Sequence, residues 1–106
     1  MEFQNIIDRA MEIRKLYVEK EIQLYGSPWT AEEIALGFVG DVGDLTKLIV
    51  ADNSKRIIPN SKEQIEHELA DCLWSVIVLA NIHQVDIEKS FMDTMARLEQ
   101  HLLENK

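Results

Sequence analysis

Residues 69–82 read Leu-Ala-Asp-Cys-Leu-Trp-Ser-Val-Ile-Val-Leu-Ala-Asn-Ile, and this stretch is apolar at almost every position. Its length and its lack of alternation predict a helix rather than a strand. A membrane span needs about 20 apolar residues, whereas this shorter run is interrupted by Asp71, Ser75 and Asn81. A helix that is apolar nearly all the way round must be covered by protein on every side.

Two helices are predicted before this one. Apolar residues recur every three or four positions over about 3–25, as in an amphipathic helix, and Gly26-Ser27-Pro28 ends the pattern. A second helix begins after Thr30, which can form a capping box with Glu33, and runs to about Ala51.

The apolar helix itself is predicted over about 62–83, with Ser61 and Gln64 as a further capping box. Asp86 is expected to cap a fourth helix over about 87–103. No segment alternates cleanly between apolar and polar residues, so no strand is expected. The prediction is a single all-α domain over residues 1–106, with a four-helix, bundle-like fold.

The apolar helix also predicts self-association. Three other helices in a chain of 106 residues cover only part of it. The remainder is expected to pack on another subunit in an obligate homo-oligomer that completes the core. The alternative is that the three helices wrap it completely.

The composition excludes several kinds of partner. The chain has 19 acidic and 11 basic residues, a net charge of −8, and therefore no general attraction for nucleic acid phosphates. The single Cys72 excludes an internal disulfide framework and is typical of a reducing compartment. Residues 1–7 do not resemble a signal peptide. We expect a cytoplasmic protein with neither a nucleic acid polymer nor a membrane as partner.

Two pairs of acidic residues are candidates for a metal site. Asp41 and Asp44 lie three residues apart on the second helix, and Glu68 and Asp71 lie three apart on the third. This spacing places both members of a pair on one helix face. If the helices pack face to face, four carboxylates converge and repel one another unless cations or protons neutralise them. Oxygen ligands of this kind select Mg²⁺ or Mn²⁺.

The spacing alone carries no weight, because a chain with this many acidic residues contains such pairs by chance. The position of the acids on the helix is stronger evidence, since Asp41 and Asp44 lie on the same helix face as the apolar residues Leu45 and Leu48. The alternative of ordinary exposed acids stays open.

Glycines at positions 37, 40 and 43 recur within the second helix, and each costs about 1 kcal/mol relative to alanine. Close approach of another helix or of a ligand would explain them, and a bend in the helix is the alternative. His67 lies four residues before Asp71 and could face it, most simply as a surface pair. No histidine has the Glu-x-x-His spacing of di-iron bundles.

The acid pairs also carry a family resemblance. Residues 37–45, Gly-Phe-Val-Gly-Asp-Val-Gly-Asp-Leu, and 67–74, His-Glu-Leu-Ala-Asp-Cys-Leu-Trp, resemble the two motifs of the MazG-like all-α nucleotide pyrophosphohydrolases. Those motifs are Glu-x-x-Glu on one helix and Glu-x-x-Asp on the next. The resemblance spans about 29–91 with the motifs in the family's order. It departs in the first motif, where both glutamates are aspartates.

The resemblance implies a helical protein that forms a dimer or a dimer of dimers. It implies Mg²⁺, or Mn²⁺, bound by Asp41, Asp44, Glu68 and Asp71, with Glu68 and Asp71 as the expected catalytic carboxylates. The implied reaction hydrolyses a nucleoside triphosphate to the monophosphate and pyrophosphate, and clearance of non-standard nucleotides is one role for it. A non-catalytic oligomeric scaffold, or a regulatory nucleotide-binding module with a degenerate metal site, is the competing interpretation.

Further residues are candidates for substrate contacts. Trp29 could stack on a base, although it could equally be a helix-entry residue. Asn81 could bind a base or sugar in a site completed by a second subunit, or be a polar break in the helix. Lys47 could touch a phosphate or be solvated, and the same alternatives hold for the loop residues Lys55 and Arg56.

Overall fold

A computed structural model describes residues 2–53 and 58–104 of the chain. It contains four helices: α1 (Phe3–Tyr25), α2 (Ala31–Asp52), α3 (Ser61–Ile82) and α4 (Ile87–Glu104). No strand occurs among the described residues. The prediction of an all-α chain is confirmed, and the helix ends agree with those expected to within one residue.

The signals at the α1–α2 junction act as predicted. Gly26 takes a left-handed conformation with φ 81°, and its N–H donates to the carbonyl of Ile22. At the start of α2 the N–H of Glu33 donates to Thr30 Oγ1 over 3.2 Å, and the N–H of Thr30 donates to Glu33 Oε1 over 3.1 Å. Both halves of the capping box are therefore present.

The capping box predicted at Ser61 is wrong. Asn60 occupies the N-cap position with φ 59° and makes no side-chain cap hydrogen bond. Ser61 instead donates from Oγ to Asp52 Oδ1 over 3.1 Å, and Gln64 donates from Nε2 to the carbonyl of Pro59 over 3.0 Å. Ser61 thus binds the last residue of α2 and Gln64 binds the connection that follows it, which leaves neither side chain free to cap.

The cap predicted for α4 is confirmed, since the N–H of Lys89 donates to Asp86 Oδ1 over 3.0 Å.

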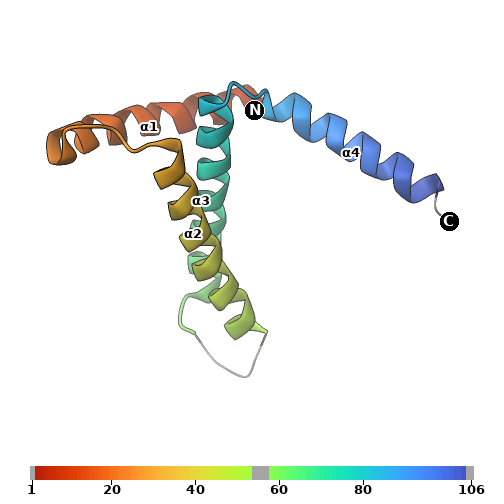
Figure 1. The fold of residues 1–106 in the computed structure, drawn as a ribbon. Helices are drawn as coiled ribbons and strands as arrows, with labels where there is room; N and C mark the ends of the chain where they lie inside the picture. Colours follow the sequence, from red (N-terminus) through yellow and green to blue (C-terminus); the bar gives the residue numbers. More distant parts are fainter. Residues whose placement is uncertain (1, 54–57, 105–106) are drawn as a thin grey trace.

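The helices α2 and α3 pack side by side as an antiparallel hairpin, while α1 and α4 leave its upper end in opposite directions (Figure 1). Trp74 on α3 joins the hairpin to α1. Its Nε1–H donates to the carbonyl of Ala10 over 3.0 Å, and its ring lies 5.5 Å from that of Tyr17, centroid to centroid. These two contacts hold α3 beside α1.

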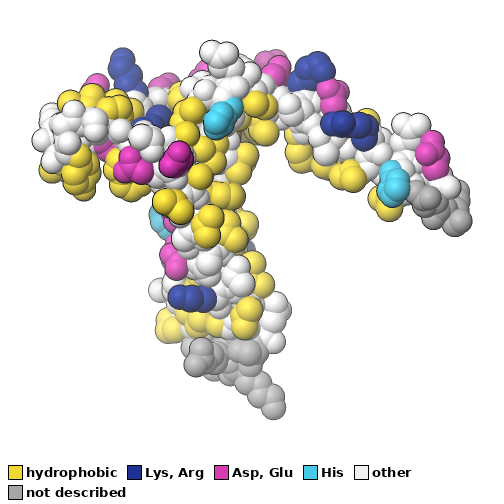
Figure 2. All heavy atoms as spheres, viewed as in Figure 1, with side chains coloured by type: hydrophobic (Ala, Val, Ile, Leu, Met, Phe, Trp, Pro, Cys, Tyr) yellow, Lys and Arg dark blue, Asp and Glu magenta, His cyan; other side chains and the backbone are white. Residues whose placement is uncertain are grey.

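The core of a single chain is small. Only Val78 is a fully buried large side chain among the described residues, and the other buried apolar residues are Ala10, Ile34, Ala51, Ile77 and Ala80. On the apolar helix α3, Leu69 is 52% exposed and Leu73 45%. Apolar side chains are also visible along α2, α3 and α4 in Figure 2.

The overall dimensions agree with an incomplete core. The radius of gyration is 17.1 Å, whereas a compact chain of this length has about 13 Å. The accessible surface is 8486 Å², against about 6,100 Å² for a compact monomer of this mass. Within the described residues, no helix combines the length and apolar character that crossing a membrane requires.

Candidate functional site

The predicted acidic residues meet where α2 packs on α3. One ligand oxygen from each of Asp41, Asp44 and Glu68 lies within 4.8 Å of the other two. Glu68 forms a second group at the same spacing with His67 and Asp71. Glu68 is therefore the member common to both groups, and each of the other three predicted carboxylates shares a group with it.

The electrostatics of Glu68 are those of a carboxylate without a counter-charge. Its Oε2 atom is buried and has no hydrogen-bond partner among the described residues. Burial raises the pKa of Glu68, and the charges of Asp71, Asp44 and Asp41 raise it further, against a smaller opposing effect of His67. A buried polar atom without a partner is costly unless something binds it.

Asp41 has a raised pKa for the same reasons. Burial contributes most, followed by the charges of Asp71 and Asp44. The two raised pKa values show that the cluster is short of positive charge, so that a cation or a proton would relieve it.

This donor set fits a small hard cation. Three oxygens that bind one ion at about 2.1 Å cannot all lie more than about 3.6 Å from one another. The oxygens of Asp41, Asp44 and Glu68 lie within 4.8 Å of one another, so they need to draw together by only about 1 Å. The shorter side chains of Asp41 and Asp44 still reach Glu68. The departure from the family's first motif therefore leaves the carboxylates gathered.

His67 joins the cluster from the same turn of α3. Its Nε2 lies 3.1 Å from Asp71 Oδ2, and the side chain of His67 is largely open to solvent whereas that of Asp71 is partly buried. The predicted pairing with Asp71 is thus present, while its place beside Glu68 was not anticipated. The sequence did contain a signal for this placement, because His67 directly precedes Glu68 in the second motif.

A cavity of about 720 Å³ adjoins the acidic cluster between α1, α2 and α3. Asp41 and Asp71 line it, as do the aromatic side chains of Tyr17, Trp29 and Trp74. Its size is in the range of small-molecule sites, which combine apolar walls with a few polar groups. One end is acidic and the rest is largely aromatic and aliphatic.

The α1 wall of this cavity was missed in the sequence. It contains a buried ion pair in which Arg14 donates to Glu21 Oε2 over 2.8 Å. Residues seven apart on a helix share a face, so the spacing was a signal, but charged residues at that spacing are common on exposed helices.

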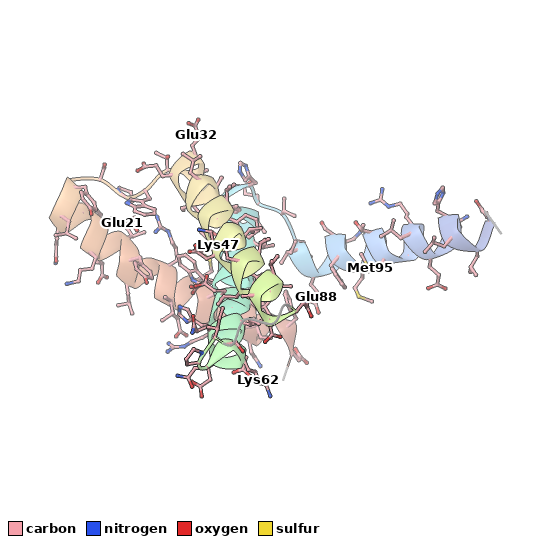
Figure 3. All side chains as sticks on the ribbon, turned by 90° about the horizontal axis from the view of Figure 1, so that it is seen from below. Glu21, Glu32, Lys47, Lys62, Glu88 and Met95 are labelled. Carbon is pink, nitrogen blue, oxygen red and sulfur yellow. The ribbon has the colours of Figure 1, made fainter. Side chains whose placement is uncertain are left out.

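Two other predicted contact residues, Lys47 and Asn81, do not line the cavity beside the acids. Lys47 is exposed on α2, one turn beyond Asp44 (Figure 3), and lines neither described cavity. Asn81 lines a smaller cavity of about 200 Å³, together with residues from the beginnings of α1 and α4. Lys55 and Arg56 fall outside the described residues.

The helical glycines are explained only in part. A Cβ atom on Gly37 would lie 3.9 Å from Trp29 Cζ3, so a side chain does approach here. At Gly40 and Gly43 nothing comes within 4 Å of such an atom. The expected close approach is therefore absent at these two positions within one chain.

The raised pKa values predict how metal-free stability depends on pH. Because Asp41 and Glu68 have raised pKa values, the folded state binds more protons than the unfolded state between the usual and raised pKa values. The free energy of unfolding contributed by these groups must fall as pH rises through that window. Thermal midpoints measured in a chelator across pH should therefore fall less steeply with rising pH for Asp41→Asn than for the unmodified protein. Parallel curves would contradict this.

The geometry can be compared with known proteins. The family model described as the MazG nucleotide pyrophosphohydrolase domain matches residues 29–101, which include α2, α3 and both acid pairs but not α1. A search of curated protein sequences found no match. The family match covers more than half of the chain, and the chain belongs to the MazG nucleotide pyrophosphohydrolase domain family.

Proposed function

We propose that the protein is a Mg²⁺-dependent hydrolase that converts a nucleoside triphosphate to its monophosphate and pyrophosphate. The observation that carries the proposal is the buried Oε2 atom of Glu68, which has no partner in the described chain and lies among three further carboxylates. A carboxylate oxygen without a hydrogen-bond partner is available as a ligand, and carboxylate oxygens are ligands that Mg²⁺ prefers. Membership of the family supports the same reaction class.

Asp41, Asp44, Glu68 and Asp71 are the proposed metal ligands, and Mn²⁺ is an alternative ion for the same donor set. The bound cation supplies charge neutralisation of the triphosphate and a lower pKa for a bound water. In the reaction a water oxygen bonds to the α-phosphorus and the bond to the bridging oxygen of the β-phosphate breaks. Glu68 or Asp71 accepts the proton of that water, and pyrophosphate leaves.

The adjoining cavity is the proposed place for the nucleoside. Because Asp41 and Asp71 line the cavity as well as the metal cluster, phosphates at the acids would direct the base towards Trp29. Trp29 is 43% exposed and is available for stacking. Lys47 remains a proposed phosphate contact from the exposed side of α2.

A second copy of the chain is the proposed partner. The accessible surface of one chain exceeds that expected of a compact monomer by about 2,400 Å². This excess is larger than the area that one partner buries in a standard protein interface. Asn81 lies ten residues beyond Asp71, about 15 Å along α3. We assign it to a site completed by the second subunit, in a homodimer or homotetramer.

Pyrophosphate release tests the proposed reaction. We expect release from at least one member of a panel of standard and modified nucleoside triphosphates, dependent on Mg²⁺ or Mn²⁺, and loss of that release in Asp71→Asn. The products should be pyrophosphate and the monophosphate in equal amounts. A folded protein that releases nothing from the panel but binds nucleotide would instead support the regulatory module.

A further inference from the structure

The connection between α1 and α2 is held by a buried ion pair. Arg14 and Glu21 on α1 are 8% and 6% exposed. Glu21 uses Oε2 to accept from Arg14 and Oε1 to accept from the backbone N–H of Trp29 over 2.7 Å. The second guanidinium nitrogen of Arg14, Nη2, donates a hydrogen bond to the Trp29 carbonyl over 3.3 Å. Two charged side chains thus bind both backbone polar groups of one tryptophan.

The pair is stable as an ionised pair. Burial alone raises the pKa of Glu21, but hydrogen bonds from Arg14 and Trp29 and the charge of Arg14 outweigh it, so that the pKa is lowered. Glu21 neutralises the charge of Arg14, and Arg14 is held by Glu21 and by the Trp29 carbonyl. The exposed side chain of Lys20 also lines the cavity.

The same residues line the cavity. Arg14, Glu21 and Trp29 lie in its wall, which Asp41 and Asp71 continue towards the acidic cluster. Figure 3 shows Glu21 on α1, on the side of the molecule where the α1–α2 connection begins. The pair belongs to the part of the chain that the family match leaves out.

We propose that Arg14 and Glu21 are positioning residues that hold Trp29 at the wall of the cavity and thereby set the affinity for the nucleoside half of the substrate. This inference rests on the proposed function. The pair acts through the Trp29 backbone and does not touch the reacting phosphates. Its loss should weaken substrate binding while leaving metal binding at the acids intact.

The test variant replaces both charges together, as Arg14→Leu/Glu21→Leu. Removing one partner would leave a buried unpaired charge, whereas replacing a buried pair by apolar side chains is often neutral for folding. Two hydrogen bonds to Trp29 disappear, each equivalent to up to about a tenfold change in an equilibrium. We expect KM to rise about tenfold or more, with kcat and the Mg²⁺ concentration for half-maximal activity changed less than about twofold.

Two further variants separate positioning from general stability. Arg14→Met/Glu21→Gln keeps an acceptor for the Trp29 N–H and should restore most of the affinity. In a Trp29→Ala background the double leucine change should raise KM little further, because the residue through which it acts is gone. Full additivity with Trp29→Ala, or an unchanged KM in a folded double variant, would overturn the proposal.

Binding of α,β-imido deoxynucleoside triphosphates of the four bases, measured by calorimetry with Mg²⁺, distinguishes a failure of the proposed hydrolysis from a failure of the positioning role. If the unmodified protein binds an analogue but releases no pyrophosphate from the substrates, the proposed hydrolysis is overturned. The effect of the double variant on affinity for the analogue then still tests whether Arg14 and Glu21 position Trp29. If it hydrolyses substrate and the double variant binds the analogue normally, only the positioning role fails. If no analogue binds and nothing is hydrolysed, both are overturned.

Discussion

Glu68→Gln is expected to lower metal-dependent pyrophosphate release about a hundredfold or more and, at the same time, to raise the thermal midpoint of the metal-free protein. These two effects have opposite signs and a common origin in the charge of one side chain. Glu68 belongs to both groups of potential ligands, with Asp41 and Asp44 on one side and with His67 and Asp71 on the other.

The loss of activity follows from the loss of a negatively charged ligand. A glutamine amide keeps an oxygen at the same distance but removes the charge that makes the group a good ligand for Mg²⁺. Stabilisation of charge by a metal ion is worth several kcal/mol in the transition state, so losing it lowers kcat/KM by about a hundredfold or more. Initial rates measured over a range of Mg²⁺ concentrations would show the loss.

The gain in stability follows from the same charge. The raised pKa of Glu68 means that its ionised form is disfavoured in the folded state. At a pH above the raised value this penalty is fully present, and an uncharged side chain removes it. The thermal midpoint in a chelator should therefore rise, and the further increase that Mg²⁺ gives the unmodified protein should disappear.

The matched control is Glu66→Gln, which makes the same chemical change two residues away on α3. Glu66 is exposed and belongs to neither group of ligands. The Glu66→Gln protein should therefore keep both the activity and the response to Mg²⁺ of the unmodified protein. A Glu68→Gln protein with undiminished release would exclude Glu68 as a ligand. A lower midpoint without metal would show that its carboxylate stabilises the fold.

The sequence predicts the helices well because their signals are local. The capping box at Thr30, the left-handed Gly26 and the cap at Asp86 each depend on residues within four positions. The failure at Ser61 shows the limit, because its hydroxyl binds Asp52 at the end of the preceding helix. A partner nine residues away, across a connection of unknown path, cannot be inferred from a capping pattern.

The acidic cluster was predictable as a group but not in detail. The spacing within each helix places two carboxylates on one face, and the family's motif order pairs the two helices. Which atom would be buried without a partner depends on how α2 and α3 pack, and only the structure identifies Glu68 Oε2.

The cavity wall on α1 was not predictable from these motifs. Arg14 and Glu21 have the spacing of ordinary surface charges, and their burial depends on where the connection to Trp29 returns across the helix. Asn81 illustrates the opposite case, since the residue is in the expected helix but one chain alone does not bring it to the acids.

The second large effect is expected on α4, where Met95→Glu/Leu98→Glu should dissociate the proposed oligomer. None of the residues of α4 is buried within one chain. Four large apolar side chains nevertheless recur along one stripe of it, at intervals of four, three and four residues: Phe91, Met95, Leu98 and Leu102, which are 40–70% exposed. Such a stripe is typical of a helix that packs on another surface.

The size of the effect follows from the symmetry of the contact. Burying a side chain such as Met or Leu contributes about 1.5–3 kcal/mol, and two positions in each of two subunits are changed at once. A dimer should therefore weaken by several orders of magnitude. Light scattering after gel filtration should give at least twice the 12.2 kDa chain mass for the unmodified protein and a single-chain mass for the variant.

Ser90→Glu/Gln100→Glu is the control, because it adds the same charge to exposed positions away from the stripe and should leave the mass unchanged. Activity distinguishes two roles of the contact. If Asn81 completes the site of the second subunit, the dissociated variant must lose pyrophosphate release even when its own acids are intact. A monomeric variant with full activity would confine the site to one chain, and a variant of unchanged mass would show that the stripe on α4 is not the interface.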